Sequence, residues 1–358
     1  MRIAIRADAS VQIGTGHVRR CGAIASALEA RGGIVGFVSR RLGVDVARMT
    51  ADFGLVELPP PAQPFEPAAG EPAHALWAEI SWEEDAAQTV AALRANAPEV
   101  IVIDHYGFDH RWHEYVRRAL GCPIVAVDDL GDRPLAAEIV VDHNYAADHV
   151  AKHAASARYA PHILGGPQYA LLSTAYRARP DFGVRQELGS VGIFLGGSDV
   201  ANASAVAWQA VRKALGENMK LEIVSTTANP HLAQLRQMAA QDGAARLTLD
   251  LPNLAGFFAA HDLQIGAGGG AVWERCCIGA PSVAIAFADN HVPVLAPLDN
   301  LGILCFSPGG SADPLVLSED VTRLAADVER RRAMSARSRA LVDGAGADRV
   351  GDAIYALA

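Results

Sequence analysis

The chain has few cysteines and no arrangement of them that suggests a metal site or a disulfide framework. Its 358 residues include five cysteines, with no Cys-x-x-Cys pair and no cluster of histidine with cysteine. That usage is typical of a reduced cytosolic protein and argues against structural zinc. We therefore expect a cytoplasmic protein that binds no metal and no cofactor.

Long apolar runs and an excess of positive charge are also absent. No uncharged apolar run approaches the roughly 18 residues of a membrane span, and the first residues enter a strand without an apolar leader. The net charge of −9 disfavours nucleic acid or an anionic membrane as the main partner. These features predict a soluble, unexported protein with a small-molecule partner, and they leave the oligomeric state open.

The length and composition instead predict two compact α/β domains. A chain of 358 residues exceeds one typical core, and 51% hydrophobic against 20% charged residues excludes a disordered protein. Short apolar runs alternate with helical patterns in two series. The predicted strands of the first series are residues 2–6, 33–38, 99–104, 123–128 and 138–142. Those of the second are residues 190–195, 220–225, 246–249, 262–265, 281–286 and 302–306.

Two such series, each with its own glycine loop, predict two Rossmann-like, doubly wound lobes that face each other across a cleft. The first lobe is expected at residues 1–165, the linker at 166–189 and the second lobe at 190–358, which ends in helices. Residues 59–72 carry six prolines and are predicted to form an extended loop within the first lobe. The charged run 329–332 is typical of a solvated helix face.

The first glycine loop ends in the histidine that is the leading catalytic candidate. Gly14, Thr15, Gly16 and His17 follow the first strand and precede a helix, with Cys21, Ile24, Ala25 and Leu28 on one face. Loops at the carboxyl ends of parallel strands bind ligands, and helix amides attract anions there. A histidine that only caps or packs on the helix is the structural alternative.

The second lobe has two further loops that could hold phosphate. Its first strand ends at Gly196, Gly197, Ser198 and Asp199, with Asn202 just inside the next helix. Glycines allow close backbone approach, and Ser198 can donate to phosphate oxygens. An ordinary capped helix start would have the same pattern.

The other loop, residues 266–270, combines glycines with an acid. Gly268, Gly269 and Gly270 open a helix, and Glu274 lies about one turn into it. A carboxylate there can accept hydrogen bonds from both ribose hydroxyls, or can simply interact with the helix dipole. The combination favours the ribose role.

The order of these segments resembles one family over nearly the whole chain. Residues 6–10, 14–17, 103–107, 196–199 and 289–290 are similar to those of the UDP-2,4-diacetamido-2,4,6-trideoxy-β-L-altropyranose hydrolases of pseudaminic acid biosynthesis, a nonulosonic acid pathway. The resemblance implies the GT-B fold and a metal-independent hydrolysis that releases UDP and the free 6-deoxy sugar. It also implies a role in glycosylation of flagellin or in surface polysaccharide.

The resemblance also implies site residues. His17 would be the general base that activates water, Gly14, Gly16 and Tyr106 would line the sugar site, and Asn202 and Asn290 would contact substrate. Separately, Asp8 ends the first strand and could orient the His17 ring. Tyr106 could equally be a half-buried aromatic with a wet hydroxyl.

One detail departs from the family pattern, and two other features raise the question of a metal site. His291 stands where the family usually has Gln, which puts one contact to sugar or phosphate in doubt. The pair Asp128 and Asp129 could hold Mg²⁺, although paired aspartates at a strand end often only cap a turn. Seven histidines of the first lobe lack the spacing of a zinc site and are expected mostly at the surface or as caps: His105, His110, His113, His143, His149, His153 and His162.

Other functions share the same architecture. A UDP-sugar-dependent glycosyltransferase differs only in its acceptor, and a hydrolysing UDP-N-acetylglucosamine 2-epimerase is related in fold. A non-enzymatic UDP-sugar sensor would need the cleft but not His17. The sequence does not indicate whether the sugar has the L-altro or a D configuration.

Overall fold

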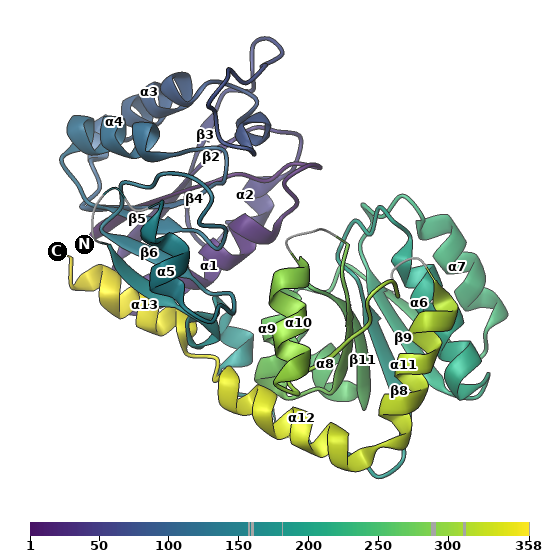
Figure 1. Cartoon of the computed structure of the whole chain (residues 1–358). Coiled ribbons are helices and arrows are strands. Elements are labelled where there is room, and N and C mark those ends of the chain that lie inside the picture. The colour runs from purple at the N-terminus through teal and green to yellow at the C-terminus, as the bar shows by residue number, and fades with distance from the viewer. Residues whose placement is uncertain (157, 159–160, 181, 288–290, 311–312, 358) are drawn as a thin grey trace. The chain divides into compact units, whose positions relative to one another are not determined.

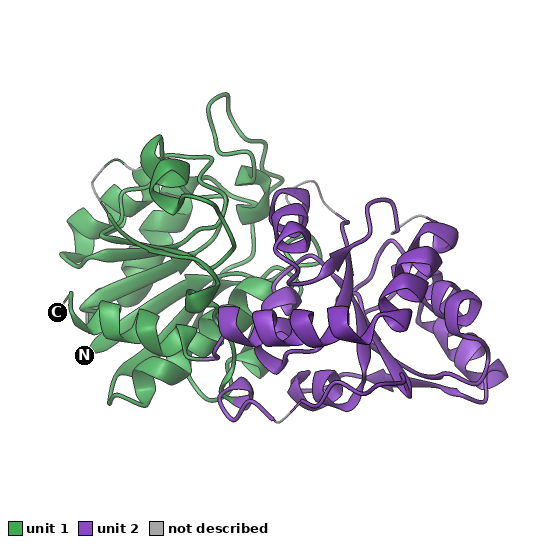
Figure 2. Ribbon diagram, turned by 60° about the horizontal axis from the view of Figure 1, so that its bottom comes forward, with its two compact units in different colours: residues 1–174, 345–358 green, residues 175–344 purple. Residues whose placement is uncertain are grey.

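Figure 1 shows the computed structural model, which describes residues 1–156, 158, 161–180, 182–287, 291–310 and 313–357. The chain forms two α/β units (Figure 2): unit 1 holds residues 1–174 and 345–358, and unit 2 holds residues 175–344. The chain passes between the units within the range predicted as a linker. The last residues differ from the prediction, which assigned them to the second lobe.

Unit 1 is built on a parallel sheet with seven strands among the described residues, in the order β3-β2-β1-β4-β5-β6-β7. The strands are β1 (Arg2–Ala7), β2 (Ile34–Arg40), β3 (Gly54–Leu58), β4 (Val100–Asp104), β5 (Ile124–Val127), β6 (Ile139–Asp142) and β7 (His162–Gly165). The register pairs Ala7 of β1 with Asp104 of β4. The ends of these two strands therefore lie side by side, which decides the geometry of the site.

Alternate side chains of this sheet enter two separate cores because successive strand residues point to opposite faces. Val100 and Val102 pack in one core, and Ile101 and Ile103 in the other. Since both faces are covered, every residue of β4 is buried. The near-continuous apolar run of β4 is thus the pattern of a parallel strand in the middle of a sheet.

The helices of unit 1 cover those two faces (Figure 1). They are α1 (Gly16–Glu29), α2 (Val46–Met49), α3 (Trp82–Leu93), α4 (His110–Leu120), α5 (His149–Ala154) and α13 (Gly346–Tyr355), with 3-10 turns η1 (Ala75–Ala78), η2 (Arg94–Asn96) and η3 (Pro167–Tyr169). Helices α1 and α13 belong to one core, and α3 and α4 to the other. The predicted apolar face of α1 is confirmed, since Cys21, Ile24, Ala25 and Leu28 are all buried.

Helix α13 explains why the end of the chain belongs to unit 1. Its residues Ala347, Val350 and Ile354 are buried in the same core as α1 and β1. At the surface, the Arg31 guanidinium donates to Asp352 at 2.8 Å. The C-terminal helix therefore completes the first core rather than extending the second.

Unit 2 repeats the plan with a parallel sheet, six-stranded over the described residues, in the order β10-β9-β8-β11-β12-β13. The strands are β8 (Ser190–Phe194), β9 (Lys220–Ser225), β10 (Ala245–Leu249), β11 (Leu263–Ala267), β12 (Ser282–Ile285) and β13 (Cys305–Phe306). The helices are α6 (Ala203–Leu215), α7 (Leu232–Gln241), α8 (Ala255–Ala260), α9 (Ala271–Ile278), α10 (Val292–Asn300), α11 (Pro314–Ala326) and α12 (Val328–Leu341), and η4 (Thr174–Tyr176) lies at the junction of the units.

The predicted strands are found in both units, and two short strands were missed. Both β3 and β7 were missed because they are edge strands with exposed residues and no apolar run. The proline-rich segment 59–72 contains no helix or strand, as predicted, and it belongs to unit 1. Within the described part of the chain, no helix has both the length and the apolar character to cross a membrane.

The prediction about the histidines was wrong, and the prediction of a solvated helix face at residues 329–332 holds for three of the four residues. Four of the seven first-lobe histidines are buried rather than exposed: His105, His113, His143 and His153. In the run 329–332, Arg331 is fully buried while its neighbours are exposed. Arg331 lies inside because it donates to backbone carbonyls, including that of Leu324 at 2.9 Å.

Candidate active site

His17 is the second residue of α1, directly after a turn that its glycines make possible. The amide of Gly14 donates to the Ser10 carbonyl at 2.8 Å, and Gly14 has φ of 75°, a left-handed conformation that favours glycine. A side chain at Gly16 would meet no atom within 4 Å. The loop therefore places His17 at the start of α1, next to the carboxyl ends of the central strands, with open space beside Gly16.

The carboxylate that holds His17 belongs to Asp104, at the end of β4. Nδ1 of His17 lies 2.6 Å from Oδ1 of Asp104, which is fully buried. Burial alone would raise the pKa of Asp104, but the charges of Arg20 and His17 outweigh it and lower that pKa well below its usual range. An ionised carboxylate only accepts, so Nδ1 carries the proton and Nε2 presents its lone pair.

The predicted orienting role of Asp8 is therefore wrong. Asp8 is fully buried and accepts from the Arg6 guanidinium at 2.5 and 2.8 Å and from the Arg40 amide at 2.7 Å. These donors draw its carboxylate toward β2. Asp104 contacts His17 instead, because β4 lies on the other side of β1.

Arg20 binds the same carboxylate with two further hydrogen bonds. Its Nε donates to Oδ2 of Asp104 and its terminal nitrogen donates to Oδ1, both at 2.6 Å. The same terminal nitrogen also donates to the Tyr106 hydroxyl at 3.0 Å. Burial disfavours the charge of Arg20, but Asp104 outweighs it and raises the pKa of Arg20 well above its usual value.

Tyr106 continues this chain of hydrogen bonds to a second carboxylate. Its hydroxyl donates to Asp129, which also accepts from the side-chain amide of Asn144. Burial raises the pKa of Tyr106 well above its usual range, while the charge of Arg20 opposes this effect and the Asp129 carboxylate adds to it. Tyr106 is 6% exposed, so it is more buried than a wet half-buried aromatic. We call His17, Arg20, Asp104, Tyr106 and Asp129 the His17 cluster.

Two aromatic residues beside the His17 cluster were missed by the sequence analysis. Trp77, in η1, lies with its ring centroid 5.9 Å from that of His17, and His74 lies 4.6 Å from Trp77. The Tyr106 ring is 4.7 Å from His17 and edge-on to it. These rings form an apolar wall next to the histidine. Their only sequence signal was a short apolar segment after the proline-rich loop.

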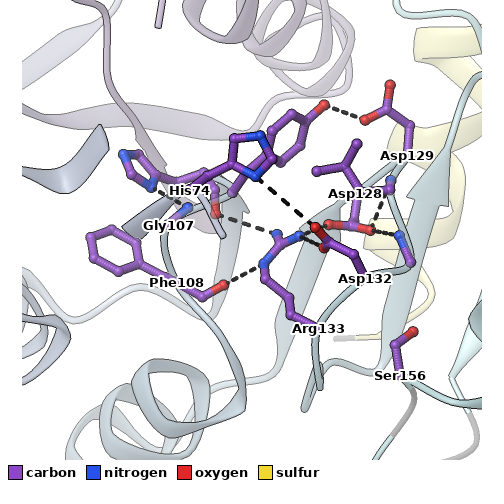
Figure 3. A network of polar contacts seen from close by, with 12 residues as sticks. His74, Gly107, Phe108, Asp128, Asp129, Asp132, Arg133 and Ser156 are labelled. Atoms are coloured by element: carbon purple, nitrogen blue, oxygen red, sulfur yellow. Dashed lines mark hydrogen bonds and ion pairs between the residues drawn. The ribbon is translucent and has the colours of Figure 1, made fainter. Parts of the chain in front are cut away.

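Asp128 has a structural role next to the cluster. Its carboxylate accepts from the amides of Leu130 and Gly131 and pairs with Arg133 at 2.5 Å. Figure 3 shows Arg133 between Asp128, Asp132 and the carbonyl of Phe108. Asp128 thus caps the turn after β5, as the turn alternative predicted. In the described residues, no three His, Cys, Asp or Glu side chains are grouped to hold a metal ion.

A cavity of about 490 Å³ lies in unit 1 beside the proline-rich loop. Its lining includes Gln12, Pro61, Phe65, Leu76 and Glu79. Leu76 and Glu79 flank or belong to η1, the turn that carries Trp77. The cavity therefore lies beside η1, the 3-10 turn that also carries Trp77.

In unit 2, the loop after β8 is shaped by its own hydrogen bonds. Gly196 has φ of 98°, and the Thr226 hydroxyl donates to the Gly197 carbonyl at 2.8 Å. Asp199 accepts from the amides of Ala203 and Ser204, both at 2.9 Å. The carboxylate of Asp199 therefore caps α6, and its predicted contact with UDP stays a prediction.

Asn202 and Ser198 lie in the same loop. Asn202 is the residue before α6, with φ of 56°, and its amide donates to Gln234 at 3.0 Å. Its side-chain oxygen is buried and has no hydrogen-bond partner among the described residues. Ser198 follows the two glycines and remains a candidate phosphate donor by position.

The second loop of unit 2 leaves β11, which pairs directly with β8. The carboxyl ends of these two strands therefore bring both predicted loops to one edge of the sheet. A side chain at Gly268 would meet Leu295 at 2.8 Å, whereas one at Gly269 or Gly270 would meet nothing within 4 Å. The backbone at the start of α9 is thus open to a ligand.

Glu274 and His291 each have contacts within unit 2. Burial and the nearby Glu274 carboxylate raise the pKa of Tyr176 well above its usual range. His291 precedes α10, and its Nδ1 accepts from the Phe287 amide at 3.4 Å. The predicted substrate contact Asn290 lies outside the described residues.

The folds of known proteins agree with this architecture. The chain superposes on Acinetobacter baumannii MurG with a TM-score of 0.64 and 14% identity, covering 99% of both chains. It superposes on Arabidopsis thaliana UGT89C1 complexed with UDP with a TM-score of 0.67 and 12% identity, covering 99% of this chain and 98% of the other. With its two parallel-sheet units, the protein has the GT-B fold.

No protein-family model matches the chain, but three curated proteins are similar in sequence. The UDP-2,4-diacetamido-2,4,6-trideoxy-β-L-altropyranose hydrolase of Campylobacter jejuni is 22% identical over 81% of this chain and 93% of that protein. The spore coat polysaccharide biosynthesis protein SpsG of Bacillus subtilis is 26% identical over 52% and 56%.

The third relative is a transferase. The UDP-N-acetylglucosamine--N-acetylmuramyl-(pentapeptide) pyrophosphoryl-undecaprenol N-acetylglucosamine transferase of Sorangium cellulosum is 30% identical over 46% of this chain and 43% of that protein. The chain thus spans about half the length of SpsG and of the transferase, and most of the length of the hydrolase.

Proposed function

We propose that the protein is an enzyme that hydrolyses a UDP-sugar at its anomeric carbon, with His17 as the general base. The observation that carries this proposal is the hydrogen bond from Nδ1 of His17 to the ionised Asp104, which leaves Nε2 as the basic atom. Nε2 has no hydrogen-bond partner in the part of the chain that the structure describes. It is therefore available to a water molecule.

The step needs only water and the nucleotide sugar. Water attacks the anomeric carbon, its proton passes to Nε2 of His17, and the bond from that carbon to the UDP oxygen breaks. UDP leaves with the electron pair of that bond as a stable anion, so the leaving group needs no acid. His17 then returns its proton to solvent, and the products are UDP and the free sugar.

The substrate we propose is UDP-2,4-diacetamido-2,4,6-trideoxy-β-L-altropyranose. The relative with that name covers more of this chain than the other two, and the wall of Trp77 and Tyr106 suits a sugar with apolar methyl groups. In unit 2 we assign UDP to the open backbone at Gly269 and Gly270 and to Ser198, with Glu274 as the ribose acceptor.

A UDP-sugar-dependent glycosyltransferase is the second candidate. The similarity to the Sorangium transferase favours it. The two reactions share the donor and differ in what attacks the anomeric carbon.

Turnover of the proposed substrate in buffer with EDTA tests the proposal, with UDP and free sugar followed by proton NMR. Wild type should release both products, and His17→Ala should lower kcat by about 10²–10⁴-fold while UDP still binds. His162→Ala, which removes an exposed histidine from the same unit, should match wild type. UDP release that requires an added acceptor would favour the transferase, and no release in either assay would refute both functions.

A further inference from the structure

Arg20 and His17 share one oxygen of the same carboxylate. Oδ1 of Asp104 lies 2.6 Å from both Nδ1 of His17 and the terminal nitrogen of Arg20, and those two nitrogens are 3.3 Å apart. Arginine keeps its charge at all physiological pH values, so both nitrogens are donors to Asp104. The Arg20 guanidinium is therefore a direct neighbour of the His17 imidazole, as well as a partner of Asp104.

This arrangement solves a problem that a lone Asp–His pair would create. A buried carboxylate within 4 Å of a histidine favours the imidazolium, which has no lone pair left to take a proton from water. A second cation at the same carboxylate opposes this effect, because a protonated His17 would lie next to Arg20. The Arg20 guanidinium also holds Asp104 through two hydrogen bonds, so the carboxylate stays oriented toward Nδ1 of His17.

We infer that Arg20 is a positioning residue that acts through Asp104, keeping His17 unprotonated and in the tautomer that a general base requires. The inference rests on the proposed function only for its consequence in turnover. Its physical content concerns three side chains of unit 1 and can be measured without any substrate.

The other titratable groups that face His17 are neutral at pH 7. Burial lowers the pKa of His74, the residue before η1, and it lowers the pKa of His105, in the turn after β4, to about 4. Tyr106 stays protonated because its pKa is raised. Among the described residues, Asp104 and Arg20 are thus the charged groups in direct contact with His17, and Asp129 lies behind Tyr106.

NMR titration of His17 in the ligand-free, full-length protein tests the inference directly. Histidine-labelled protein gives the signal, and its loss in His17→Ala assigns it. Arg20→Gln should raise the pKa of His17 by about 1 unit or more, since an opposing charge within hydrogen-bond distance is removed. Arg20→Lys keeps the positive charge but loses the two-point contact of the guanidinium, and it should raise the pKa of His17 by less.

Two further variants keep the test decisive. Asp104→Asn leaves the Arg20 charge without its carboxylate and should lower the pKa of His17, the opposite direction. Arg19→Gln removes the same charge from the adjacent exposed residue and should leave that pKa unchanged, because solvent screens it. If Arg20→Gln does not fold, Arg20→Lys and Asp104→Asn still give the predicted opposite shifts.

A rise in Arg20→Gln no larger than that in Arg19→Gln, or a fall, would overturn the inference. With active enzyme, the acid limb of kcat/KM against pH should move upward in Arg20→Gln by the same number of units as the NMR titration. A shifted titration in a protein without hydrolase activity would refute the proposed function and leave the role of Arg20 standing.

Discussion

The two units share a fold but treat their buried arginines differently. Arg6 and Arg40 in unit 1, and Arg275 and Arg331 in unit 2, are all essentially excluded from solvent. Arg6 and Arg40 both pair with Asp85, at 2.6 and 2.8 Å. Arg275 and Arg331 donate to backbone carbonyls instead, at 3.0 Å for Ala267 and 2.9 Å for Leu324.

The pKa shifts follow this difference in partners. Burial opposes the charge of Arg6, but Asp8 and Asp85 outweigh it and raise its pKa, whereas burial lowers the pKa of Arg275 to about 10. Unit 1 therefore holds balanced buried charges at the ends of its strands. Among the described residues of unit 2, Arg275 has no carboxylate within ion-pair distance, and it donates to the Ala267 carbonyl at the end of β11, next to the loop that we assign to UDP.

Acidification should produce the largest difference between the two units, because it should destabilise unit 1 more than unit 2. Burial lowers the pKa of His105 and His143 to about 4 and of His113 to about 3, all in unit 1, while an unfolded histidine titrates near 6.5. The unfolded state then binds more protons, so stability is complete above pH 6.5 and falls as the pH drops toward 3–4. Each histidine contributes about 2 kcal/mol of this loss by pH 5.

Hydrogen exchange with mass spectrometry at pH 7 and pH 5, corrected for intrinsic rates, checks this expectation. Peptides of unit 1 should lose protection, and peptides of unit 2 are the internal reference. His113→Gln should reduce the effect, because its amide oxygen can still accept from the Ala136 amide, which donates to His113 at 3.2 Å. Equal loss of protection in both units would contradict the expectation that unit 1 is more sensitive to acid than unit 2.

Removing the shared carboxylate of unit 1 should be the next largest effect. Asp85→Ala leaves Arg6 and Arg40 buried with fewer acceptors and also removes the partner of the Trp112 indole. The free energy of unfolding in urea should fall by about 3–5 kcal/mol. Glu83→Ala, an exposed change on the same helix, should cost less than about 1 kcal/mol. Similar losses in the two variants would mean that the ion pairs of Asp85 with Arg6 and Arg40 add little to the free energy of unfolding.

The corresponding change in unit 2 should have a small effect on stability. Arg275→Met removes one hydrogen bond to Ala267 and a buried charge that has no carboxylate in ion-pair contact within the described part of the chain, and methionine fills similar space. We expect a change of about 1 kcal/mol or less in urea unfolding. UDP affinity measured by calorimetry should weaken, more strongly at low salt. A loss as large as that of Asp85→Ala would show that buried arginines act alike in both units.

The strands were predictable because parallel strands buried on both faces are continuous apolar runs. The partner of His17 was not predictable, since Asp8 and Asp104 both end strands and only the order β2-β1-β4 decides which one faces His17. Arg20 had a usable signal: it lies three residues after His17, which puts both side chains on one face of α1. Asp199 had no such signal, because it lies three residues before Asn202, the residue that precedes α6, and only the fold of the loop brings its carboxylate to the amides of Ala203 and Ser204.

The return of α13 to unit 1 has a consequence for how the protein is made. Unit 2 is contiguous in the chain and is fully synthesised once residue 344 is added, whereas unit 1 lacks Ala347, Val350 and Ile354 until the later residues are added. A nascent chain can therefore complete the second core before the first. A chain that stopped between residue 344 and α13 would therefore contain all residues of the second core but lack part of the core of the unit that carries His17.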